Sequence, residues 1–77
     1  MDLTDRQIAI IKAAVEEFTE TAKPVGSVTL EKKYKLGVSP ATLRNEMAVL
    51  EEKGFLSQSH TSAGRTPPST AIKFYIN

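Results

Sequence analysis

Apolar residues recur at every third or fourth position along much of the chain, which is the spacing of helices with one buried face. In the first such stretch the apolar positions are Ile8, Ile11, Val15 and Phe18. Thr4 and Gln7 have the spacing of a capping box, in which each side chain bonds the other residue's backbone N–H. We therefore predict a helix over residues 4–21, and its solvent-exposed face is expected to carry Glu16, Glu17 and Glu20.

A second, shorter helix is predicted over residues 27–35, where Leu30 and Tyr34 are four positions apart. Pro24 separates it from the first helix, because a proline in a helix interior interrupts the hydrogen-bond ladder. Ser27 is the expected N-cap, since a serine hydroxyl accepts from a backbone N–H of the first turn.

The third helix, residues 39–53, has both of its ends marked in the sequence. Ser39 is an N-cap residue, and Pro40 occupies the first helical position, where a missing N–H costs nothing. Gly54 suits the left-handed residue that follows a helix. The apolar stripe of this helix consists of Leu43, Met47 and Leu50.

The second and third helices are joined by a short turn containing Gly37, which is the helix-turn-helix arrangement. The first half of the third helix carries small residues, Arg44 and Asn45, with no carboxylate before Glu46. Arginine can bond guanine and asparagine can bond adenine in a DNA major groove. The alternative is a capped surface helix with a solvated arginine, and these residues alone leave both interpretations open.

Residues 55–67 are predicted to form a β-hairpin, which is called a wing when it follows a recognition helix. Its polar residues can reach phosphates or a minor groove, namely His60, Thr61, Ser62 and Arg65. The alternative is a loop whose hydroxyls bond their own backbone. The DNA role is favoured because Arg65 is expected at the tip and no acid is present after Glu52 to neutralise it.

A short C-terminal helix over residues 69–76 completes the predicted fold. The fold class is mainly α with a small β-hairpin: a winged helix-turn-helix with a three-helix core, a wing and this last helix, in one domain over residues 1–77.

Composition narrows the possible functions. The 77 residues contain 40% hydrophobic residues, enough for one modest core, and no cysteine, which excludes disulfides and thiolate metal sites. The net charge is only +1, but most acids lie in residues 2–20 and 46–52, so a positive side is expected around the helix-turn-helix and the C-terminal third. There is no membrane-spanning run and no signal-peptide pattern, so a cytoplasmic location is expected.

An enzyme is not expected from these residues. His60 and Ser62 are close in sequence, but no acid after Glu52 is available to orient the imidazole as a hydrolase triad requires. One histidine without cysteine also makes a metal site unexpected, and no cofactor is predicted.

Four motifs resemble a known family. They are PVGS at 24–27, S-x-A-T-L-R-N-E-M at 39–47, LEEKG at 50–54 and HTSAGR-x-P at 60–67. They are similar, from about residue 3 to residue 67, to the N-terminal winged-helix domain of the heat-inducible transcription repressor family HrcA. The wing motif is the most specific of the four.

This resemblance implies a repressor of chaperone operons that binds an inverted-repeat operator as a dimer. Family members carry a larger C-terminal domain for dimerisation and regulation, so a homodimer is expected to form through a region absent from this chain. Pro40 stands where a second serine is usual, and after Pro67 only the hydrophobic rhythm of the family is kept.

The leading hypothesis is a domain that binds double-stranded DNA through the helix at 39–53, with no small-molecule substrate. The alternatives are the winged-helix domain of another regulator, a winged helix used for protein contact and, least favoured, a small enzyme. The residues expected at the DNA are Lys35, Ser39, Pro40, Thr42, Arg44, Asn45, His60, Thr61, Ser62 and Arg65.

Overall fold

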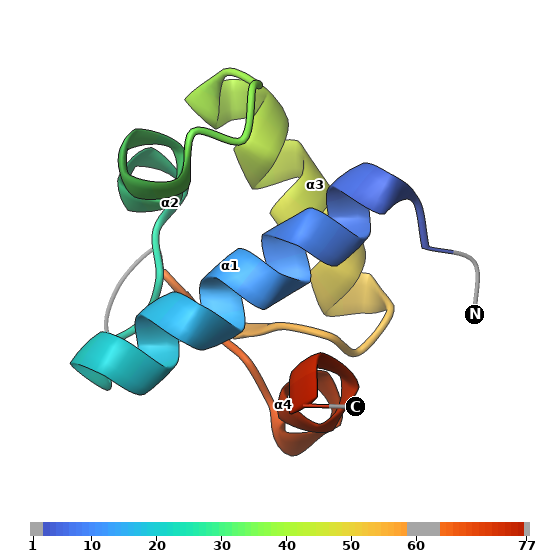
Figure 1. Cartoon of the computed structure of the whole chain (residues 1–77). Coiled ribbons are helices and arrows are strands. Elements are labelled where there is room, and N and C mark those ends of the chain that lie inside the picture. Colours follow the sequence, from blue (N-terminus) through green and yellow to red (C-terminus); the bar gives the residue numbers. More distant parts are fainter. Residues whose placement is uncertain (1–2, 59–63, 77) are drawn as a thin grey trace.

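The computed structural model describes residues 3–58 and 64–76 and shows a small helical domain with a hairpin (Figure 1). In chain order its elements are α1 (Asp5–Thr21), α2 (Ser27–Tyr34), α3 (Pro40–Glu52), β1 (Ser57–Gln58), β2 (Arg65–Thr66) and α4 (Ser69–Ile76). In Figure 1, α1 crosses the molecule in front of α3, with α2 above α1 and α4 below it. Each helix begins and ends within one residue of the bounds predicted from the sequence.

The capping box at the start of α1 is confirmed. Thr4 Oγ1 accepts from the backbone N–H of Gln7, and Gln7 Oε1 accepts from the backbone N–H of Thr4, each at 3.0 Å. These reciprocal bonds satisfy amide groups that a helix start otherwise leaves without a partner.

The predicted ends of α3 are also confirmed. Ser39 Oγ accepts from the backbone N–H of Thr42 at 3.2 Å, and Pro40 is the first helical residue. Gly54 follows the helix with φ +87°, and Gly37 in the preceding turn has φ +82°. Both glycines therefore adopt the left-handed backbone conformation that other residues rarely take.

Two details of α2 differ from the prediction. Its N-cap is Gly26, which has no side chain to form a cap bond, and Ser27 is already inside the helix. At the other end Lys35 is left-handed, with φ 49°, and donates its backbone N–H to the carbonyl of Glu31. The helix therefore ends at Tyr34 rather than at Lys35.

The core lies where α1 meets the other helices, and it includes the predicted stripe of α3. Its members are Ile10, Ile11, Ala13, Ala14, Val15, Val25, Leu30, Leu43, Met47, Leu50, Phe55, Leu56 and Ala71. The predicted stripe of α1 was partly wrong, because Ile8 and Phe18 are only half-buried while Ile10 is fully buried. Since α1 packs against α2, α3 and α4, it buries a wider face than a single stripe.

The prediction that Glu17 faces solvent is wrong. Its carboxylate is buried between α1 and α2, where it accepts from Lys33 Nζ at 2.9 Å and from the Tyr34 hydroxyl at 3.3 Å. Lys33 also bonds Glu20 at 2.7 Å, and its bonds to Glu20 and Glu17 raise the pKa of the Lys33 ammonium. Burial raises the pKa of the Tyr34 phenol, and the nearby carboxylates of Glu16 and Glu17 raise it further.

The hairpin is attached to the link between α1 and α2. β1 and β2 pair antiparallel, with Gln58 opposite Arg65. On its other side Arg65 forms a second antiparallel bridge, with Val25. The Arg65 N–H donates to the Val25 carbonyl at 2.8 Å, and the Val25 N–H donates to the Arg65 carbonyl at 2.7 Å. A helix-turn-helix followed by such a hairpin is the winged-helix fold, which confirms the predicted fold class.

Candidate nucleic-acid interface

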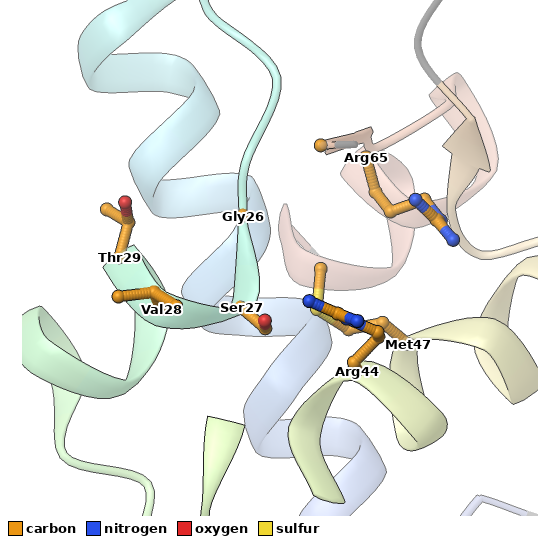
Figure 2. A pocket seen from close by; sticks show the side chains of 8 residues that line it. Gly26, Ser27, Val28, Thr29, Arg44, Met47 and Arg65 are labelled. Carbon is orange, nitrogen blue, oxygen red and sulfur yellow. The ribbon is translucent and has the colours of Figure 1, made fainter. Parts of the chain in front are cut away.

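An open pocket of about 390 Å³ lies between the first turn of α2, the side of α3 and the start of β2 (Figure 2). Its lining residues are Gly26, Ser27, Val28, Thr29, Arg44, Met47, Gly64 and Arg65. Figure 2 shows the side chains of Ser27, Arg44 and Arg65 around this space, each coming from a different element. The fold thus joins the two helices of the helix-turn-helix and the base of the wing in one concave surface.

The α2 side of the pocket is a helix N-terminus without a side-chain cap. Because its N-cap is Gly26, the first-turn amide groups have no hydroxyl or carboxylate of the cap as acceptor. Such a terminus has a partial positive charge, and no acid occurs in this first turn. The start of α2 and the Arg44 side chain line the same pocket, and together they suit a negatively charged group such as a DNA phosphate.

The α3 side presents small and polar side chains. Arg44 and Asn45 are exposed in the first half of the helix, as the sequence predicted, and Ala41 and Ala48 leave space around them. Of these four residues, only Arg44 lines the pocket. A helix with this surface can approach base edges closely, because its small residues do not hold the backbone away from the DNA.

The residues near the start of α3 that were predicted to contact DNA differ in how available their side chains are. The Ser39 hydroxyl forms two hydrogen bonds with Thr42. It accepts from the Thr42 backbone N–H at 3.2 Å and donates to Thr42 Oγ1 at 3.0 Å. Pro40 is exposed at the first helical position. Lys35 is exposed just after α2, about 12 Å along that helix from its first turn, so it lies away from the pocket.

The structure corrects the sequence prediction for Arg65. The residue begins strand β2 instead of occupying the wing tip, and its side chain is only 17% exposed. Its Nε donates to Oε1 of Glu51 on α3 at 2.9 Å, so an acid does neutralise it. The remaining predicted wing residues lie outside the described part of the chain: His60, Thr61 and Ser62.

Sequence reasoning missed several residues that shape this surface. Val28 is an apolar side chain that stays 50% exposed on the rim of the pocket. Gly64 is needed because a Cβ there would lie 2.8 Å from Pro24 Cβ. Glu51 gave no local signal, because its partner Arg65 is fourteen residues further along the chain.

Within 3–58 and 64–76, no three acidic, histidine or cysteine side chains are grouped as metal ligands would be. None of the helices in this part of the chain is both long and apolar enough to cross a membrane.

Comparison with known sequences gives one consistent family, although no family model matches the chain. The heat-inducible transcription repressor HrcA of Pelotomaculum thermopropionicum is 54% identical over all 77 residues, which cover 22% of that protein. HrcA of Clostridioides difficile is 53% identical over the same 77 residues, or 23% of its length. HrcA of Chloroflexus aggregans is 54% identical over 74 residues, 96% of this chain and 20% of that protein.

A solved structure supports the fold. The crystal structure of a protein described as hypothetical, at 2.2 Å resolution, superposes with a TM-score of 0.90 and 41% sequence identity. The match covers 95% of this chain and 24% of the other. The chain spans about a fifth of the length of the curated relatives it matches. Over its full length, therefore, this chain corresponds to the N-terminal portion of the heat-inducible transcription repressors of the HrcA family.

Proposed function

We propose that this chain is the DNA-binding domain of a transcription repressor and that α3 enters the major groove of its operator. The observation that carries the proposal is exposed Arg44 beside the uncapped start of α2, with Asn45, the next residue of α3, also exposed. The HrcA name of its relatives supports a repressor, because those proteins are described as heat-inducible transcription repressors.

In this mechanism Arg44 reads a base edge together with Asn45 or Thr42. Ser39 and the first turn of α2 approach the phosphates on either side of the groove, which fixes the register of α3 without reading sequence. Pro40 and Lys35 complete the predicted contacts of the helix-turn-helix.

The wing contributes through the residues predicted for it, His60, Thr61, Ser62 and Arg65. Contacts from a wing to the DNA backbone or a minor groove would extend the footprint beyond the few base pairs that one helix reads. Since Arg65 bonds Glu51, its guanidinium would combine a structural contact with any contact to DNA.

The operator and the homodimer are proposed from the family resemblance. The operator would be an inverted repeat upstream of chaperone genes, bound by a homodimer assembled through a region beyond these 77 residues. A dimer with two-fold symmetry matches an inverted repeat because each protomer meets an identical half-site.

A salt titration tests the proposal. Binding of the domain to a fluorescein-labelled 30-base-pair duplex selected from a random library is followed by anisotropy at several salt concentrations. Phosphate contacts release counterions, so log K should fall linearly with log salt, with a slope of about −0.9 for each phosphate neutralised. No selectable duplex and no salt-dependent binding would favour the alternative, a winged helix that contacts another protein.

A further inference from the structure

The pair Glu51–Arg65 joins the recognition helix to the hairpin. Glu51 lies in the last turn of α3 and Arg65 begins β2, and their Oε1 and Nε atoms are 2.9 Å apart. The side chains are 32% and 17% exposed, so the pair is partly shielded from water. A pair in this environment is screened less by salt than one on an open surface.

Arg65 also connects the hairpin to the rest of the fold through its backbone. It pairs with Gln58 of β1 on one side and bonds Val25 twice on the other. The same residue therefore touches the link between α1 and α2 through its main chain and α3 through its side chain. Its main-chain bonds hold the position of β2, and its bond to Glu51 adds a direct connection to α3.

We propose that Glu51 is a positioning residue for DNA binding: through Arg65 it fixes the base of the wing relative to α3. The inference rests on the proposed function, and it assigns a role to an acid that was not among the residues predicted at the DNA. Glu51 does not touch DNA in this proposal. It sets the geometry in which α3 and the wing bind one duplex together.

Removal of Glu51 should change the affinity for DNA in the opposite direction from the one that electrostatics alone predicts. A carboxylate near DNA repels phosphates, so its removal should tighten binding if charge alone mattered. If Glu51 positions the wing, its removal should weaken binding, because α3 and the wing no longer fit the duplex at the same time.

The variants are Glu51→Ala, Glu51→Gln and the control Glu52→Ala. Glu52 is the next residue of α3, is exposed, and makes no ion pair with another described residue, so its removal changes the net charge equally. Affinity is measured on the duplex selected by the parent domain. We expect Glu51→Ala to lose about 2- to 30-fold, the range for a residue that couples two parts of a site. Glu52→Ala should bind as well as the parent or better.

Two readouts separate positioning from general destabilisation. Glu51→Gln keeps an oxygen that accepts from Arg65 Nε, so it should recover most of the affinity. Hydroxyl-radical footprints of Glu51→Ala should lose the outer protection that the wing gives while the protection centred on α3 remains. In the background of Arg65→Ala, the Glu51→Ala change should have no further effect.

Three results would overturn the proposal. Glu51→Ala could bind as tightly as Glu52→Ala, it could weaken binding equally in the Arg65→Ala background, or its footprint could fade uniformly together with a lowered melting temperature. The proposed function fails separately, if the parent domain itself binds no selected duplex. If Arg44→Ala loses binding while Glu51→Ala does not, the proposed function stands and the role of Glu51 is wrong.

Discussion

Gln7 of α1 donates from Nε2 to Oε1 of Glu46 on the recognition helix, at 3.3 Å. The other end of the same amide, Oε1, accepts from Thr4 and caps α1. Arg6 forms an ion pair with the same carboxylate, with 3.6 Å between Arg6 Nη1 and Glu46 Oε2. The start of α1 thus bonds the middle of α3, on the side of that helix away from Arg44.

Gln7→Ala should lower the free energy of unfolding by about 1–2 kcal/mol, since each of two lost hydrogen bonds contributes about 0.5–1.5 kcal/mol. The change removes the bond from the Thr4 N–H and the bond to Glu46, while the Thr4 hydroxyl still accepts from the backbone N–H of residue 7. Urea unfolding followed by circular dichroism measures the effect, with the exposed Thr19→Ala on the same helix as the control. An unchanged midpoint for Gln7→Ala would show that these bonds contribute no net stability.

Arg44→Ala should weaken specific binding by about 1–3 kcal/mol and relax the preference at one base position. Because Arg44 is exposed, the free energy of unfolding should change by less than about 0.5 kcal/mol. Competition against single-base variants of the selected duplex measures the preference, and Lys12→Ala on the exposed face of α1 is the control. If Arg44→Ala retains the parent's affinity and base preference, Arg44 does not read bases.

Gly64→Ala should destabilise the domain by about 1–3 kcal/mol, the cost of forcing an extra methyl into a packed site. The new Cβ would lie 2.8 Å from Pro24 Cβ and 3.2 Å from the backbone nitrogen of Val25, so the base of the hairpin must shift. Gly26→Ala is the matched control, since no atom lies within 4 Å of a Cβ there. Equal melting temperatures for the two variants would refute the close approach at Gly64.

Stability should fall at alkaline pH through the titration of Lys33 and Tyr34. The pKa values of Lys33 and Tyr34 are both raised above their ordinary values of 10.5 and 10.0. A raised pKa means that folding favours the protonated form, so this stability is complete below about pH 10 and is lost as the pH rises further. Melting temperatures between pH 8 and 11 measure the fall.

Tyr34→Phe should make that alkaline fall shallower, because it removes one of the two titrating groups while keeping the ring. Lys12→Ala removes a lysine of α1 that forms no hydrogen bond or ion pair with Glu17, Lys33 or Tyr34, and it serves as the control. A profile for Tyr34→Phe that is parallel to the parent's over the whole range would show that Tyr34 does not contribute to the pH dependence.

The 77 residues alone should bind a half-site weakly as a monomer. Their single core already uses the apolar faces of α1 and α3, and the exposed large apolar side chains among those whose burial the structure describes are Val28 and Val49. Fusion to an unrelated dimerisation domain, with a linker that spans one turn of DNA, should raise affinity for an inverted repeat about 10²- to 10⁴-fold.

A mobility-shift assay compares the monomer, the fusion, and the fusion on a repeat with one half scrambled. Scrambling should remove the gain, since both halves must be bound together. Nanomolar binding by the untethered chain, or indifference of the fusion to the scrambled half, would contradict paired half-site recognition.

Local signals in the sequence predicted where α1 and α3 begin and end to within one residue. Thr4 with Gln7 and Ser39 with Gly54 mark helix ends, because caps and left-handed turns depend on residues within about four positions of each other. The exposure of Arg44 and Asn45 also followed from the sequence, since the apolar stripe of α3 defines the opposite, buried side.

The tertiary structure alone decided the contacts between elements. The sequence placed Glu17 on the surface and left Arg65 without an acid, yet packing buries Glu17 against Tyr34 and brings Glu51 to Arg65. These partners are seventeen and fourteen residues apart, and Gln7 and Glu46 are thirty-nine apart. Periodicity and capping carry no information over such separations, because the distances depend on how whole helices and the hairpin pack around one core.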